Sequence, residues 1–328
     1  MEEKTMNKMN FNEFKNYIQE HLGEYLSEEF KNCEMRISTI KKSSGYEYEG
    51  LNISRANDAD GGIIPVLNLS EAFEKYAKGQ PLEKICEGLA DVRMNTPIPG
   101  SINRSTFTNF QSMKDRIFPR LISAKGQEEY LGDKPFRKVA DLAVVYAVRV
   151  QADEHGFAEA VIDDKLLDLW GVDEDTVHQV AIENLEKQEP VFVNLEDAMF
   201  GSLDAHEPPK FDLESINMDN CPIPFFILTN QQKVKGATMA LNSKYMDQIF
   251  EKFGGIYVLP SSTHEVLIVP KTFMDDPDQL AQMVRQVNED AVQPEDRLSD
   301  NVYEYNPETQ SLEIASTDPV QGEVVVMG

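Results

Sequence analysis

The sequence predicts an α+β fold in which helices cover one face of antiparallel sheets. Short apolar runs alternate with polar residues, as in half-buried strands, and other runs repeat at helical spacing. A strand, a second strand and a helix follow one another three times, in residues 46–78, 143–170 and 225–253. This pattern indicates repeated strand-strand-helix units, which arise either by duplication or from the common order of elements in α+β domains.

An N-terminal α+β lobe is expected at residues 10–94, after a polar tail at residues 1–9. Apolar residues recur at helical spacing in residues 10–22, and Gly23 follows at a C-cap position. Alternation predicts the strands of this lobe, and capping residues or a proline mark the starts of its other helices. The strands are expected at residues 35–40, 46–53 and 63–69, and the helices at residues 71–78 and 82–94.

One or more C-terminal α+β lobes are expected at residues 106–315, followed by a tail at residues 316–328. Residues 95–105 contain two prolines and a glycine, and therefore predict a linker between the lobes. Apolar residues at helical spacing in residues 110–122 predict a helix, and its proline indicates either a kink or two short pieces. Residues 126–138 are polar.

The remaining elements follow from the same two periodicities and from glycines that end helices. Strands are expected at residues 139–150, 157–162, 191–193, 225–229, 237–241, 256–259, 266–269, 302–305 and 312–314. Helices are expected at residues 164–170, 174–185, 244–253 and 277–287. The segment 199–220 is long, polar and contains prolines, which predicts a surface loop.

The composition indicates a soluble globular protein. The chain has 328 residues, of which 41% are hydrophobic and 27% are charged. Its 57 acidic and 31 basic residues give a net charge of -26, which argues against binding to the phosphate backbone of nucleic acids. This charge suits either a basic protein partner or simply the solvated surface of a protein from an acidic proteome.

The cysteines predict neither a disulfide nor a metal site. Cys33, Cys86 and Cys221 are far apart, form no CxxC pair and have no histidine at ligand spacing. Three free thiols are typical of a reducing cytoplasm. The N-terminus has no apolar segment of a secretory signal, and the longest apolar run, residues 142–148, is too short to cross a membrane. We therefore expect a cytoplasmic protein that needs no metal or cofactor.

The densest mixture of apolar and reactive polar residues lies in residues 259–270. Two apolar runs, each closed by a proline, predict a pair of strands with a polar turn between them. Ser262 and His264 would share one face of a strand, the arrangement from which a nucleophile and its base are built. Alternatively, the hydroxyls bond the turn and His264 is a structural histidine. The candidate binding residues of this stretch are Ser261, Ser262, His264 and Glu265.

No known catalytic motif accompanies these residues. His264 and Glu265 begin like a zinc-protease helix, but Ile268 stands where the second histidine ligand would be. The sequence has no GxxxxGK[ST] loop, no GxGxxG after a strand and no GxSxG elbow. It therefore predicts no catalytic, cofactor-binding or metal-binding residue.

A group of basic residues is the second candidate site. Arg120 lies in one segment with Arg116, Arg137 and Arg149, beside Tyr130 and several carboxylates. The group predicts either a ligand-binding cluster, with Arg120 and Tyr130 as its candidate residues, or a surface of salt bridges.

Four stretches together carry a family resemblance. They are Lys114-x-x-Ile117-x-Pro119-Arg120-Leu121-Ile122, Glu129-Tyr130-Leu131-x-Asp133-Lys134-Pro135, Asp141-Leu142-Ala143-Val144-Val145-Tyr146 and Leu259-Pro260-Ser261-Ser262-x-His264-Glu265-Val266. Over about residues 9–315 the chain resembles an uncharacterised domain-of-unknown-function family of gut Firmicutes, often found in accessory or mobile-element gene content. The resemblance implies a bacterial cytoplasmic protein, and it carries no established activity, cofactor or catalytic residue.

Three functions are compatible with these features. The first is a cytoplasmic, non-enzymatic interaction or accessory protein with a protein partner. The second is a hydrolase or small-ligand-binding enzyme that uses the Ser262 and His264 region with Arg120 and Tyr130. The third is an acidic mimic of nucleic acid that binds a basic partner, which the net charge of -26 suggests.

Overall fold

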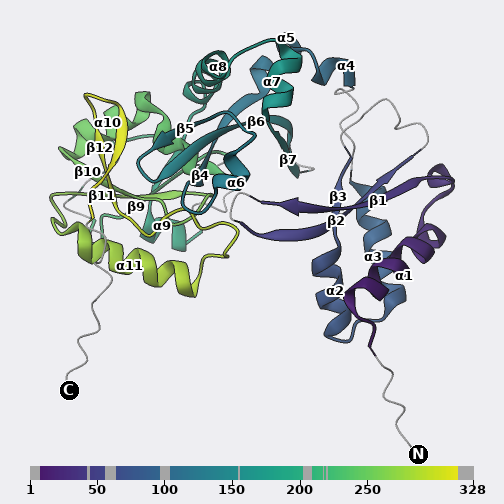
Figure 1. Ribbon diagram of the computed structural model, residues 1–328. Coiled ribbons are helices and arrows are strands. Elements are labelled where there is room, and N and C mark those ends of the chain that lie inside the picture. Colours follow the sequence, from purple (N-terminus) through teal and green to yellow (C-terminus); the bar gives the residue numbers. More distant parts are fainter. Residues whose placement is uncertain are drawn as a thin grey trace, which may run out of the picture. The chain divides into compact units, whose positions relative to one another are not determined.

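The computed structural model describes residues 8–42, 45–55, 64–96, 104–153, 156–201, 209–216, 218 and 221–316. It confirms an α+β fold with antiparallel sheets (Figure 1). The chain forms two compact units: the first contains residues 1–42 and 46–112, and the second contains residues 43–45 and 113–328. The expected linker at residues 95–105 lies largely outside the described residues, as do most of the two expected tails.

The first unit is a three-stranded antiparallel sheet whose strands follow in sequence order. Its strands are β1 (Glu34–Lys41), β2 (Glu47–Ser54) and β3 (Val66–Asn68). Three helices cover one face: α1 (Phe11–His21), α2 (Leu69–Ala77) and α3 (Leu82–Asn95) (Figure 1). Short 3-10 turns, η1 (Leu22–Tyr25) and η2 (Glu28–Phe30), connect α1 to β1.

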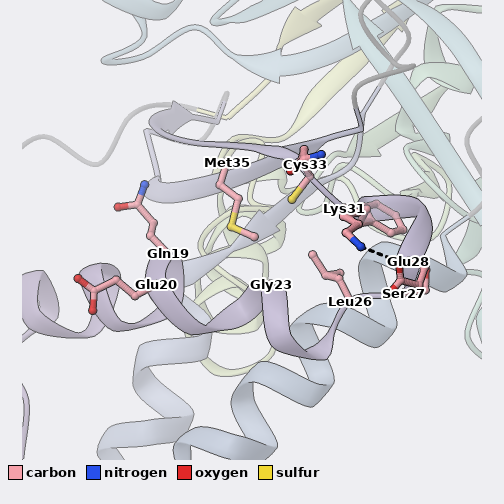
Figure 2. Close-up of a pocket in the computed structure, with 11 residues that line it drawn as sticks. Gln19, Glu20, Gly23, Leu26, Ser27, Glu28, Lys31, Cys33 and Met35 are labelled. Atoms are coloured by element: carbon pink, nitrogen blue, oxygen red, sulfur yellow. Dashed lines mark hydrogen bonds and ion pairs between the residues drawn. The ribbon is translucent and has the colours of Figure 1, made fainter.

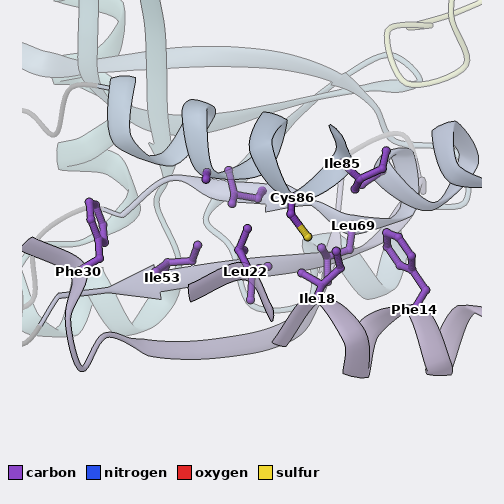
Figure 3. Packing of buried hydrophobic residues seen from close by; sticks show 12 residues of the cluster. Phe14, Ile18, Leu22, Phe30, Ile53, Leu69, Ile85 and Cys86 are labelled. Carbon is purple, nitrogen blue, oxygen red and sulfur yellow. The ribbon is translucent and has the colours of Figure 1, made fainter. Parts of the chain in front are cut away.

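The core of the first unit follows from the spacing of apolar residues. Phe14, Ile18 and Leu22 are four residues apart, so they form one stripe along α1 and its extension, and all three are fully buried. Figure 3 shows this stripe facing Ile53 of β2 and Cys86 of α3. The helix begins where the sequence predicts, because the Asn10 side chain and Glu13 form a reciprocal capping box.

The second unit contains a four-stranded sheet built around one long strand, β6 (Leu142–Asp153). β4 (Ile117–Ser123) pairs with one edge of β6, while β5 (Phe136–Val139) and β7 (Gly156–Val161) pair with the other. The predicted helix over residues 110–122 is therefore wrong, because only Phe110–Met113 (α5) is α-helical before a short turn and β4. Pro119 is compatible with this strand because β4 pairs with β6 on one side only.

A six-stranded antiparallel sheet forms the rest of the second unit, in the order β13-β12-β10-β11-β9-β8. The predicted strand pair over residues 256–259 and 266–269 is confirmed as β10 and β11. The strands are β8 (Val191–Asn194), β9 (Phe226–Thr229), β10 (Ile256–Leu259), β11 (Val266–Pro270), β12 (Tyr303–Asn306) and β13 (Ser311–Ile314).

Helices contact both faces of this six-stranded sheet. Phe226 stacks on Phe253 of α10, with ring centroids 5.2 Å apart, whereas the preceding Phe225 packs with Leu280 of α11 on the opposite face. Helices therefore cover one face of the sheet in the first unit, as the sequence predicts, but they contact both faces of the six-stranded sheet. The helices of the unit are α6 (Glu128–Leu131), α7 (Asp164–Trp170), α8 (Glu174–Glu186), α9 (Leu195–Met199), α10 (Ser243–Phe253) and α11 (Pro277–Asp290).

The predicted strand at residues 237–241 is wrong, since this segment is the 3-10 helix η7 (Gly236–Leu241). The chain reaches η7 through two left-handed residues, Lys233 (φ 55°) and Lys235 (φ 56°), which turn it away from an extended path. The first two predicted strand-strand-helix units do contain paired strands, but the third has η7 in place of its second strand.

Candidate functional site

The polar turn between β10 and β11 is held by the segment that precedes β12. The Leu298 amide donates to the Ser261 carbonyl at 3.1 Å, and the Thr263 amide donates to the Asp296 carbonyl at 2.7 Å. Ser262 and Arg297 also form an isolated β-bridge. Backbone pairing therefore fixes the turn at Ser261, Ser262 and Thr263, and Ser261 takes part through its backbone carbonyl.

His264 does not pair with the Ser262 hydroxyl through its ring. The Ser262 Oγ accepts from the His264 backbone N–H at 3.0 Å, and the Ser262 side chain is buried. The His264 Nε2 lies 3.2 Å from Asp296 Oδ1, and its Nδ1 accepts from the Lys235 amide at 3.4 Å. Activation of a serine requires a ring nitrogen at its hydroxyl, and here both nitrogens contact other groups.

Lys235 joins this turn from a loop that the sequence did not single out. Its Nζ lies 3.1 Å from Thr263 Oγ1 and 3.2 Å from Asp296 Oδ1. Lys235 has a left-handed backbone, and the buried Asn230 side chain bonds both the amide and the carbonyl of Val234. Non-glycine residues persist in this conformation only where the surrounding structure holds them.

Arg120 and Arg149 converge on one carboxylate on a face of the four-stranded sheet. Arg120 of β4 forms an ion pair with Glu159 of β7, and the Arg149 Nε lies 4.0 Å from the same carboxylate. The Arg149 guanidinium also stacks over the Phe118 ring at 3.9 Å. Burial lowers the pKa of both arginines and raises the pKa of Glu159, although each ion pair opposes that shift.

Electrostatic interactions connect these two groups within the second unit. Lys235 acts electrostatically on Glu159, and Arg120 acts on the Tyr130 hydroxyl, whose pKa is raised chiefly by burial. By the charged cluster we mean Arg120, Tyr130, Arg149, Glu159, Lys235, His264 and Asp296.

The cluster brings together only some of the residues that the sequence proposed. Arg120, Tyr130 and His264 belong to it, and the charges of His264 and Asp296 act on Glu265 beside it. Arg137 points to the opposite face of its sheet and pairs with Asp175 of α8, because successive residues of a strand alternate. Sequence reasoning missed Lys235, Glu159 and Asp296 as members, since no local spacing connects them to His264.

Two carboxylates beside His264 are expected to give opposite pH dependences. Burial would raise the pKa of Asp296, but Lys235, His264 and Thr263 outweigh it and hold that pKa below the ordinary 3.8. Burial raises the pKa of Glu265 above the ordinary 4.5, despite His264 and a hydrogen bond from Ser262.

The direction of each change in stability with pH follows from the difference between the native and the ordinary pKa of the group. A carboxyl group whose pKa is lowered by folding stabilises the fold above its ordinary pKa, and this stabilisation is lost as the pH falls through the native pKa. A carboxyl group whose pKa is raised by folding destabilises the fold at high pH, and this destabilisation disappears below its ordinary pKa. Asp296→Asn should therefore be less stable than the parent at neutral pH, with a deficit that shrinks below pH 3.8. Glu265→Gln should be more stable at neutral pH, with an advantage that disappears below pH 4.5. Urea titrations of both variants and the parent across pH test these expectations. If the differences in stability between variant and parent did not change with pH, the assigned pKa shifts would be wrong.

A second feature of this unit is an apolar surface at α9. Met199 is 79% exposed, Phe200 is 85% exposed and Ile223 is 51% exposed. Together with Leu195 and Glu196 they line a hollow of about 340 Å³. We call Leu195, Met199, Phe200 and Ile223 the α9 patch. The sequence placed residues 199–220 in a polar loop, and the adjacent apolar pair at its start was the signal that could have revealed the patch.

The first unit carries a larger and more polar hollow of about 530 Å³ between η1, η2 and β1. Figure 2 shows Met35 and Cys33 on its strand side, and Gly23 and Leu26 on its helical side. Burial raises the pKa of the Cys33 thiol, which keeps it protonated and weakly reactive.

Among the described residues, no group of three or more histidine, cysteine or acidic side chains is arranged to hold a metal ion. Cys33, Cys86 and Cys221 are free thiols. Within the same part of the chain, no helix combines the length and the apolar character needed to cross a membrane.

The fold and these surfaces define a two-unit α+β protein with a charged cluster and an exposed apolar patch in its second unit. The chain belongs to a family of unknown function, DUF5688, whose family model matches residues 11–307. No curated protein and no solved structure matches it.

Proposed function

We propose that this protein is a cytoplasmic, non-enzymatic interaction protein that binds another protein through the α9 patch. The observation that carries the proposal is the exposure of Met199, Phe200 and Ile223 around one hollow. Complete burial of a methionine or phenylalanine side chain is favourable by about 1.5–3 kcal/mol. Contiguous exposed apolar surface of this kind is typical of interaction sites.

The patch is presented by a helix that is anchored to the six-stranded sheet. The Asn194 side chain caps α9 by accepting from the Glu196 amide at 2.8 Å, and the Leu195 amide donates to the Phe225 carbonyl at 2.7 Å. Leu195 and Ala198 pack against the buried residues of β8 and β9. Because the backbone of an anchored helix is already ordered, binding at its surface loses less conformational entropy.

The other two functions have weaker support. A hydrolase at Ser262 would need a base, and the His264 ring bonds Asp296 and Lys235 instead. Mimicry of nucleic acid is supported by the net charge of -26 alone. We also propose a bacterial cytoplasm and accessory gene content as its setting, which free thiols and the family resemblance support.

Phe200→Asp is expected to weaken partner binding at least about 30-fold, because a central aromatic anchor contributes about 2 kcal/mol or more. The partner can be represented by peptides selected from a random library on the immobilised wild-type protein. Their dissociation constants for the wild type and for Phe200→Asp are then measured by fluorescence anisotropy.

Leu169→Asp is the matched control, since Leu169 of α7 is 60% exposed in the same unit but does not line the hollow. It should leave peptide binding unchanged. Selected peptides that bind Phe200→Asp as tightly as the wild type, or a selection that yields no peptide sensitive to Phe200→Asp, would refute the proposed function.

A further inference from the structure

The α9 helix separates two hollows of different character. One is the apolar hollow of the α9 patch, and the other, of about 500 Å³, is lined by β8, α9 and residues 209–216. Glu196 lines both, so the two hollows adjoin along the helix. A bound segment that crosses α9 would therefore contact both surfaces.

The second hollow is acidic. The exposed carboxylates Glu196, Asp197 and Asp212 line it, against one exposed cation, Lys210. The pKa of the Cys221 thiol in its wall is raised, first by burial and then by the charges of Asp197 and Glu196. Negative charge thus acts within the hollow, and the net charge of the chain has the same sign.

We infer that the partner is a basic segment of another protein, in which an apolar side chain fills the apolar hollow and neighbouring Lys or Arg side chains lie over the acidic hollow. This inference rests on the proposed function. Apolar contacts supply the affinity at such a site, while complementary charge steers association and selects the partner. Lys and Arg side chains suit this site because their aliphatic stems can cover apolar surface while their charged ends face the carboxylates.

Peptides selected on the wild-type protein should combine an aromatic or aliphatic residue with adjacent Lys or Arg. Removing the charges of Glu196 and Asp197 from the acidic hollow, by Glu196→Gln with Asp197→Asn, should weaken the binding of these peptides about three- to tenfold, as expected for two exposed charge pairs. Increasing the sodium chloride concentration should weaken wild-type binding and should have less effect on the neutralised variant.

The matched control neutralises two exposed carboxylates of α7, Asp164→Asn with Asp168→Asn, and should leave binding unchanged. Anisotropy titrations of each variant at low and high salt decide between the outcomes. Neutral apolar peptides that are sensitive to Phe200→Asp but not to salt or to removal of the charges of Glu196 and Asp197 would overturn the basic partner and leave the proposed function standing. Peptides insensitive to Phe200→Asp would overturn the function itself.

Discussion

Gly236→Ala is expected to lower the free energy of unfolding of the second unit by about 3 kcal/mol, the upper range for overpacking a core. A Cβ atom on Gly236 would lie 2.6 Å from both the Asn230 amide nitrogen and the His264 carbonyl oxygen, and would also overlap the Thr229 hydroxyl. Two of these neighbours are backbone atoms, so rotation of a side chain cannot relieve the contact. The left-handed Lys235 and the bond from Thr229 to the His264 carbonyl would be displaced with it.

The measurement is a urea titration followed by the fluorescence of Trp170, the single tryptophan, which is buried in the second unit. Gly254→Asn is the control in the same unit. Its Cβ would meet no atom within 4 Å, and Asn tolerates the left-handed backbone that Gly254 adopts. Equal midpoints for Gly236→Ala and the parent would show that η7 does not pack this closely against the turn.

Asp141→Ala is expected to cost about 3 kcal/mol, because it removes a carboxylate that accepts several hydrogen bonds between the two sheets of the second unit. Asp141 precedes β6, and its carboxylate accepts from the hydroxyl of the buried Tyr303 in β12. It also accepts from Asn301 Nδ2 at 3.0 Å and lies 3.3 Å from Ser299 Oγ. Alanine would remove this acceptor from a partly desolvated site, where only the Tyr303 hydroxyl keeps another one, Ser299 Oγ at 2.8 Å.

A graded series separates this effect from a general effect of charge. Asp141→Asn should cost less than alanine, since its amide oxygen can still accept from Tyr303. Adding Tyr303→Phe to Asp141→Ala should cost less than the sum of the single changes, because the two residues share one hydrogen bond. Asp168→Ala on the exposed face of α7 should leave the urea midpoint unchanged. Additive effects of Asp141→Ala and Tyr303→Phe would show that the bond contributes no coupling energy.

Periodicity predicted most of the elements correctly. The strand pair β10 and β11 was evident from two continuous apolar runs, each closed by a proline, and the helix α1 was evident from its helical spacing and capping residue. β4 was mistaken for a helix because the apolar residues Met113, Ile117 and Leu121 also fit helical spacing. The segment is a strand because it pairs with β6, and a strand depends on a partner that lies elsewhere in the chain.

The candidate sites were less accessible to sequence reasoning. Arg120, Tyr130 and His264 were proposed from their residue types, but Lys235 and Asp296 contact each other across 61 positions. The α9 patch was missed because exposure is a property of the folded surface. An apolar residue is equally compatible with a core position, and Met199 and Phe200 differ from core residues only in what packs on them.

The sequence by itself determined the α+β class, the acidic character, the free thiols and the positions of most helices and strands. These depend on composition, on periods of 2 and 3.6 residues and on local capping, all of which act within one segment. Only the tertiary structure decided that both ring nitrogens of His264 are engaged, that two arginines share Glu159 and that the α9 patch is left uncovered. Each of these depends on distances between segments that are far apart in the sequence and meet only in the folded chain, so no local pattern records them.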